Sequence, residues 1–164
     1  MNKRIVYTND IGVVCVVIPA PEMFNQNSKT RDLIKADLKN EEEVLSYIAK
    51  SLVPNGVKYK IIDASEIPSR DFRDAWVLDN DRIDHDMEKC RNIWKEKIRS
   101  VRASILTKLD VEYQKADEIS DIAAKKEIAR KKQILRDVTS MPEIKEAKTP
   151  EELKAVWPEV LNEI

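Results

Sequence analysis

The fold of this chain is decided by one stretch, residues 83–118, which reads IDHDMEKCRNIWKEKIRSVRASILTKLDVEYQKADE. It contains neither proline nor glycine, and its apolar residues recur every three or four positions, the period of one helix face. These residues form a seam over about three heptads: Met87, Cys90, Trp94, Ile98, Val101, Ile105 and Leu109. A continuous helix of this length spans roughly 50 Å. The stretch therefore predicts a long amphipathic helix.

The residues that follow predict a second helix beside the first. Ser120 or Asp121 can cap its N-terminus, and Pro142 is expected to end it. Its apolar residues are Ile122, Ala129, Ile134, Leu135 and Val138. Because consecutive helices joined by a short turn usually pack side by side, the two predict an antiparallel αα-hairpin.

A short third helix is predicted near the C-terminus. Thr149-Pro150-Glu151-Glu152 combines an N-cap residue, a proline at the first helical position and an acidic first turn. The helix is expected to continue through Trp157 and to end at Pro158. Trp157 is a candidate anchor that docks on another surface, either within this chain or on a partner.

The N-terminal part reads as a small sheet. Residues 4–8 and 13–18 are β-branched runs separated by Asn9-Asp10-Ile11-Gly12, which predicts a β-hairpin. The second run is apolar on both faces, which indicates a strand covered on both sides. Residues 58–62 alternate as a further strand, and residues 75–78 are a candidate fourth.

A helix is predicted to accompany this sheet. Asn40 is an N-cap candidate that precedes three glutamates, and a stripe of Val44, Leu45, Ile48 and Leu52 follows. Asn55-Gly56, after Pro54, is expected to stop this helix. Residues 23–39 read as a loop with a short helix. The sequence thus predicts an α+β protein: residues 1–82 form a small antiparallel sheet with one helix, and residues 83–164 form the hairpin and its C-terminal helix.

Composition limits the classes of function. The 164 residues include 29 lysines and arginines against 30 aspartates and glutamates, so no overall charge favours nucleic acid or acidic membranes. The longest apolar run, residues 11–20, is far short of the roughly 20 residues that span a bilayer. Cys15 and Cys90 lie far apart and are expected to be buried free thiols. We therefore expect a cytosolic protein without a membrane anchor.

No residue set predicts a catalytic, cofactor-binding or metal-binding site. His85, the only histidine, lies in Asp84-His85-Asp86, but zinc sites need three or four ligands with matching spacing. We expect it in an exposed first turn of the long helix. A group of acids follows the third strand, and acids of this kind are common in turns: Asp63, Glu66, Asp71, Asp74, Asp79 and Asp81. General acid–base chemistry there is the less favoured alternative.

Two basic clusters lie in the predicted hairpin, within residues 89–102 and 125–136. Their members are Lys89, Arg91, Lys95, Lys97, Arg99 and Arg102, then Lys125, Lys126, Arg130, Lys131, Lys132 and Arg136. One interpretation is phosphate contact along a basic face. These charges fall around several helix faces without interleaved aromatics, so a solvated face or a protein partner is favoured and nucleic acid is unlikely.

Four stretches of the C-terminal half stand out together: residues 99–109, DVEYQKAD at 110–117, KQILRDVT at 132–139 and Trp157-Pro158. Through these stretches the C-terminal half resembles phage tail-assembly chaperone and tail-fibre-assembly-like proteins. That family has an arginine-rich helix, a Gln-x-Leu-Arg-Asp-(Ile/Val) helix end and a Trp-Pro near its C-terminus. It usually has Asp-Trp where this chain has Asp110-Val111, and a shorter spacer before Trp-Pro. Residues 18–22 and 72–76 are similar to small proteins encoded among phage structural genes.

The resemblance implies a non-enzymatic protein that docks on phage tail or tail-fibre proteins in the cytoplasm of the host bacterium, without cofactors. Leu153, Val156 and Trp157 are the residues predicted to dock on the partner. One alternative is a structural component retained in the virion at the tail, baseplate, fibre attachment or head–tail junction. A second is nucleic-acid binding by the basic hairpin. A homo-oligomer is compatible with either docking role.

Overall fold

The computed structural model describes residues 2–32, 38–80 and 82–162 and divides the chain into two compact units. Unit 1 is Met1–Asp86, and unit 2 is Met87–Ile164. The expected boundary lay after residue 82, four residues earlier, because residues 83–86 read as the start of the long helix. The fold is α+β, as the sequence predicts.

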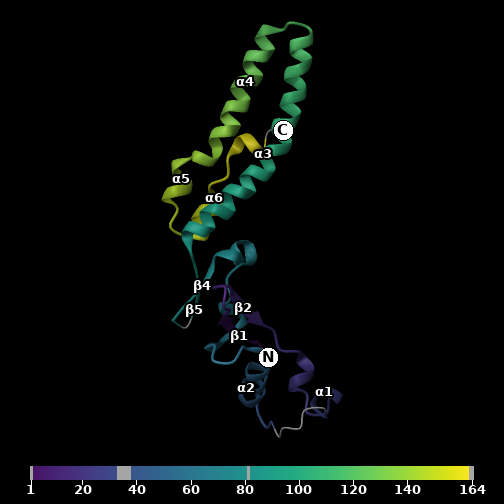
Figure 1. Cartoon of the computed structure of the whole chain (residues 1–164), viewed down its shortest axis with the longest axis vertical. Coiled ribbons are helices and arrows are strands. Elements are labelled where there is room, and N and C mark those ends of the chain that lie inside the picture. Colours follow the sequence, from purple (N-terminus) through teal and green to yellow (C-terminus); the bar gives the residue numbers. More distant parts are fainter. Residues whose placement is uncertain (1, 33–37, 81, 163–164) are drawn as a thin grey trace. The chain divides into compact units, whose positions relative to one another are not determined.

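Unit 1 is built on a three-stranded antiparallel sheet (Figure 1). Its strands are β1 (Lys3–Thr8), β2 (Val14–Val17) and β3 (Tyr59–Asp63), in the order β2-β1-β3. The predicted hairpin is confirmed as the β1–β2 pair. Its turn closes where the Asn9 amide donates to the Val13 carbonyl over 2.9 Å and the Asn9 side chain accepts from the Val13 amide over 2.8 Å. Gly12 adopts a φ of +79°, a conformation that favours glycine.

The two faces of this sheet carry separate cores, because successive side chains of a strand point in opposite directions. Ile5 packs with the buried face of α2 (Glu41–Leu52), whereas Val6 packs with Trp76 and Ile83. The latter two belong to β4 (Trp76–Asp79) and β5 (Arg82–His85), which form a separate two-stranded sheet. The candidate fourth strand therefore exists but does not extend the first sheet, and the expectation that His85 lies in a helix was wrong.

The predicted cap of α2 is confirmed. The Asn40 side chain accepts from the Glu43 amide over 2.9 Å, and the Glu43 carboxylate accepts from the Lys39 amide over 2.7 Å. Leu52 was expected on the buried stripe but is 58 % exposed. The helix ends at Leu52, and Val53, in an extended conformation, takes the place in the core.

Short helical turns complete unit 1. They are η1 (Pro21–Phe24), α1 (Lys29–Asp32), η2 (Ala64–Glu66) and η3 (Arg70–Ala75). The loop with a short helix expected over residues 23–39 matches η1 and α1 in part, and residues 33–37 lie outside the described residues.

Unit 2 is a helical hairpin of α3 (Met87–Glu118) and α4 (Ile122–Asp137), which run antiparallel in Figure 1. Of the two candidate caps of α4, Asp121 is the N-cap, because its side chain accepts a hydrogen bond from the Ala124 amide over 2.9 Å. Ser120 instead makes the turn, with a φ of +56°. The long helix and the hairpin are thus confirmed.

The remainder of unit 2 folds back on α3. It comprises η4 (Val138–Ser140), α5 (Pro142–Glu146), α6 (Pro150–Ala155) and η5 (Glu159–Leu161). Pro142 was expected only to end α4, but it opens α5, where the first helical position needs no amide donor. Thr149 caps α6 as predicted. That helix ends at Ala155, two residues before the expected Trp157.

Candidate interaction site

The predicted seam of α3 forms the centre of unit 2. Cys90, Trp94, Ile98, Ile105 and Leu109 are buried, whereas Met87 and Val101 are half-buried. Both cysteines are free thiols, and Cys15 of unit 1 is half-buried where full burial was expected. From α4 and the turn after it, Ile128, Leu135 and Val138 are buried in unit 2. Ile122, at 77 % exposure, Ile134, at 39 %, and Ala129 lie in α4 as predicted but are exposed and do not join them.

Lysine stems take the place of those apolar residues. The ammonium groups of Lys125 and Lys132 lie 5.5 and 5.4 Å from the centre of the Tyr113 ring on α3. Lys125 pairs with Asp117, and Lys132 pairs with Asp110. The hydrogen bond to Asp117 raises the pKa of Lys125. Because a lysine stem covers apolar surface while its charge reaches an acid, a helix face that reads as polar in the sequence packs against α3.

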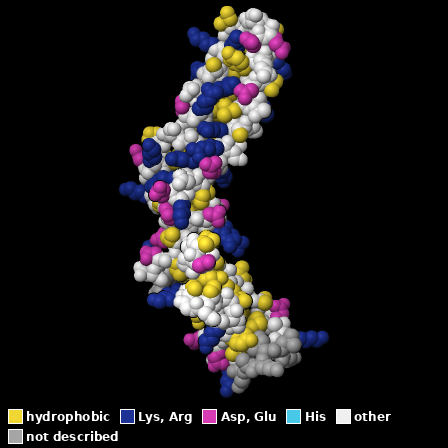
Figure 2. Space-filling view, viewed as in Figure 1, with side chains coloured by type: hydrophobic (Ala, Val, Ile, Leu, Met, Phe, Trp, Pro, Cys, Tyr) yellow, Lys and Arg dark blue, Asp and Glu magenta, His cyan; other side chains and the backbone are white. Residues whose placement is uncertain are grey.

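Two arginines of the first basic cluster donate hydrogen bonds to backbone carbonyls of unit 2. Arg102 donates to the carbonyls of Leu135 and Arg136 over 3.1 and 2.9 Å, at the end of α4 where helix carbonyls lack partners. Arg91 donates to the carbonyl of Ala147 over 2.9 Å. Figure 2 shows Lys and Arg side chains interspersed with Asp and Glu along the hairpin. These contacts give the basic clusters a structural role within unit 2.

The strip predicted to dock on a partner packs inside unit 2. Leu153 is fully buried, and the ring of Trp157 meets that of Trp94 edge-on with their centres 5.7 Å apart. The Trp94 indole donates to the Val156 carbonyl over 2.9 Å, and the Trp157 indole donates to Asn162 over the same distance. Of the two readings of Trp157, docking within the chain is the one found. Leu153 and Trp157 thus serve the packing of unit 2.

The candidate acid–base groups of unit 1 are engaged in local turns. Asp63 caps η2: its carboxylate accepts from the amide and hydroxyl of Ser65 over 3.0 and 2.8 Å, and these bonds lower its pKa. The Glu66 carboxylate accepts in return from the Asp63 amide over 2.8 Å. Asp71 pairs with the Ser69 hydroxyl. Asp74 and Asp79 are exposed, and Asp81 lies outside the described residues.

Metal-binding geometry is absent from the part of the chain that the structure describes. No group of three or more His, Cys, Asp or Glu side chains is placed to hold an ion there. His85 is half-buried in β5.

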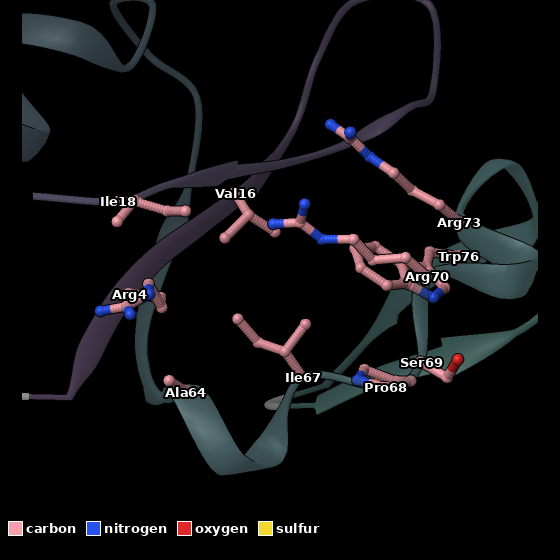
Figure 3. Close-up of a pocket in the computed structure, with 10 residues that line it drawn as sticks. All are labelled: Arg4, Val16, Ile18, Ala64, Ile67, Pro68, Ser69, Arg70, Arg73 and Trp76. Carbon is pink, nitrogen blue, oxygen red and sulfur yellow. The ribbon is translucent and has the colours of Figure 1, made fainter.

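A hollow of about 380 Å³ in unit 1 combines cations with an apolar wall. Figure 3 shows Ile67 between Arg4 on one side and Arg70 with Trp76 on the other. Arg73 also lines the hollow. Trp76 is only 3 % exposed, and its buried indole N–H has no hydrogen-bond partner among the residues that the structure describes. Within the described residues, no carboxylate pairs with Arg70 or Arg73.

Two further hollows adjoin the first around the segment after β2. One of about 160 Å³ shares Arg4 and Ile18 with it. The other, of about 330 Å³, shares Ile18 and Pro19 with the second and reaches Leu52 on α2. We call these three hollows the docking track.

Sequence reasoning missed the docking track. The regular spacing of Arg70, Arg73 and Trp76 was visible, but their proximity to Arg4 depends on how β1 and η3 are brought together. Leu52, expected in the core, lies in the track instead.

Among the described residues, no helix is both long enough and apolar enough to cross a membrane. Comparisons with protein-family models, with curated proteins and with solved structures found no match to this chain.

Proposed function

We propose that this chain is a phage tail or tail-fibre assembly protein that acts by docking on other proteins, without catalysis. One observation supports this most: the stretches that carry the family resemblance contact one another in unit 2. Arg102 of the first stretch binds the carbonyls of Leu135 and Arg136, and Asp110 pairs with Lys132. Because these residues hold the two helices of the hairpin together, the stretches that resemble the family are expected to occur in the same chain.

The Trp-Pro stretch belongs to the same module. Trp157 packs on Trp94, and Pro158 is buried. Because these residues are used in building unit 2, we place partner contact on other residues, of which the docking track of unit 1 is the strongest candidate.

The test is affinity purification of the tagged full-length chain from infected cells while tails assemble, with mass spectrometry of the bound proteins. We expect a tail or tail-fibre protein at near-equal molar amount. Recovery of host proteins alone, or of none, would reject the proposal.

A matched pair of variants shows whether recovery depends on the hairpin. Lys132→Asp removes the pair with Asp110, whereas Lys126→Asp makes the same charge change at an exposed position of the same helix. Because partner contact is placed on the docking track of unit 1, we expect both variants to recover the tail protein in the same amount as the unchanged chain does. A loss with Lys132→Asp alone would place the contact on the hairpin instead.

Retention in the virion is the alternative docking role. Mass spectrometry of purified virions separates the two, because a transient assembly factor is absent from the particle. A stoichiometric amount in the virion would replace the assembly role with the structural one.

A further inference from the structure

We propose that the docking track of unit 1 binds an extended acidic segment of a tail or tail-fibre protein. A carboxylate of that segment pairs with Arg70 and Arg73, and an apolar side chain a few residues away fills the hollow beside α2. This inference rests on the proposed function, to which it adds the surface and the chemistry of the partner.

The charged end of the track is built for a carboxylate. The guanidinium groups of Arg70 and Arg73 are exposed and come from one turn, η3. The adjacent acid, Asp71, is engaged by the Ser69 hydroxyl over 2.9 Å. A planar guanidinium matches both oxygens of a carboxylate. Two arginines beside a hollow that pair with no carboxylate of the described residues therefore favour an acidic ligand.

The other end of the track is apolar. Ile18 is 56 % exposed and Leu52 is 58 % exposed, and both line the hollow of about 330 Å³. Met23 and Ile48 form further parts of its wall. Neither arginines nor lysines line this hollow. Exposed aliphatic side chains around a concavity of this size suit one bulky apolar side chain of a partner.

The arrangement favours an extended peptide over nucleic acid. Bases bind through exposed aromatic faces. Trp76, which lines the charged hollow, is buried, and the exposed Tyr47 lines the hollow beside α2 and not the one with the two arginines. The hollows follow the segment after β2, which is an edge strand of the three-stranded sheet. An extended peptide can follow such an edge while its side chains enter pockets beside it.

The binding test uses an array of overlapping peptides from the tail and tail-fibre proteins of the phage that encodes this chain, probed with the full-length protein. We expect bound peptides to contain acidic residues near a bulky apolar residue. Replacing their Asp and Glu by Asn and Gln should reduce the bound signal about tenfold. Absence of bound peptides, or binding that is unchanged by the amide replacements, would overturn the proposal.

Charge-matched variants locate the binding surface. Arg70→Glu with Arg73→Glu should also reduce the signal about tenfold. Lys50→Glu with Lys58→Glu makes the same charge change at exposed positions of unit 1 that do not line the track. This second pair should leave binding within about twofold. Far-ultraviolet circular dichroism shows whether both pairs remain folded, and equal losses in the two folded proteins would contradict the assignment.

The tryptophan indoles provide a readout that needs no substitution. Trp94 and Trp157 donate hydrogen bonds within unit 2, whereas Trp76 lines the track and its N–H finds no acceptor in the described part of the chain. In a ¹H–¹⁵N NMR titration with the strongest array peptide, the Trp76 indole signal should move and the other two should stay. Movement of the other two alone would place the peptide elsewhere.

The outcomes separate this inference from the proposed function. If tagged Arg70→Glu/Arg73→Glu protein recovers the tail protein from infected cells as well as the unchanged chain does, the track is rejected and the function stands. If the array peptides bind as expected but infected cells yield no tail protein, the proposed function fails.

Discussion

At the scale of single residues, burial and partner docking make opposite predictions for Leu153. The side chain is fully buried in unit 2, so Leu153→Ala should lower the free energy of unfolding by about 2–5 kcal/mol. Ile122→Ala, at a position that is 77 % exposed, should change it by no more than about 0.5 kcal/mol. Urea denaturation of the two variants measures both. Equal midpoints would mean that Leu153 is free to meet a partner.

Lys132 tests whether a charged residue can serve as part of a core. Its side chain is only 15 % exposed, pairs with Asp110 and covers the Tyr113 ring. Lys132→Ala removes the stem and the charge and should cost about 1 kcal/mol or more, whereas Lys132→Met keeps most of the stem and should cost less. Lys126→Ala, at an exposed position of α4, is the control. Thermal denaturation that ranks the alanine and methionine variants equally would contradict a packing role for the stem.

The lowered pKa of Asp63 predicts that the free energy of unfolding depends on pH. The Ser65 amide, as the main cause, lowers the pKa of the folded carboxyl below its unfolded value of about 3.9. The carboxylate therefore stabilises the fold above the unfolded value, and this contribution is lost as pH falls through the folded value. Asp63→Asn should be less stable than the unchanged chain at pH 7, with a gap that narrows below about pH 4. Denaturation curves across this range would refute the assignment if the gap stayed constant.

At the scale of elements, Ser120 and Asp121 have different roles at the start of α4, and substitutions at the two positions should change stability differently. Asp121 accepts from the Ala124 amide, so Asp121→Ala should lower stability by about 0.5–2 kcal/mol. Ser120 has a positive φ, so Ser120→Gly should leave stability unchanged or raise it. Chemical denaturation compares the two directly. A larger loss from Ser120→Gly would make Ser120 the cap.

Elements whose signals are local were predictable. The period of α3 and the caps at Asn40 and Thr149 depend on residues within one or two turns, and all were found in the structure. The packed face of α4 was not predictable. Lys125 and Lys132 count as polar residues in a sequence pattern, but most of each side chain is an apolar stem that packs against α3.

Features that depend on distant parts of the chain were also missed. The Trp94–Trp157 contact joins α3 to the C-terminal segment, and the docking track joins β1, the segment after β2, η3 and α2. Local spacing carries no information about which of these segments meet. The sequence therefore predicted which residues are important in unit 2, but it did not predict the docking track on unit 1.

At the scale of the whole molecule, unit 2 should fold without unit 1. Its buried residues on α3 pack with α4, α6 and the turns after them, all within residues 87–164. A fragment of those residues should therefore show a helical circular dichroism spectrum and a cooperative melt. Leu153→Ala in the fragment should lower the melting temperature as it does in the full chain. A fragment without a cooperative transition would show that unit 2 depends on unit 1.

The central claim is that the chain works by binding a phage tail or tail-fibre protein along the docking track. The most direct measurement places a photo-crosslinking amino acid at Ile18, which all three hollows share, and illuminates infected cells during tail assembly. The control position is Val111, which is 46 % exposed on α3. We predict an adduct with an acidic segment of a tail or tail-fibre protein from Ile18 and none from Val111. Adducts with host proteins only, or the same adduct from both positions, would contradict the account.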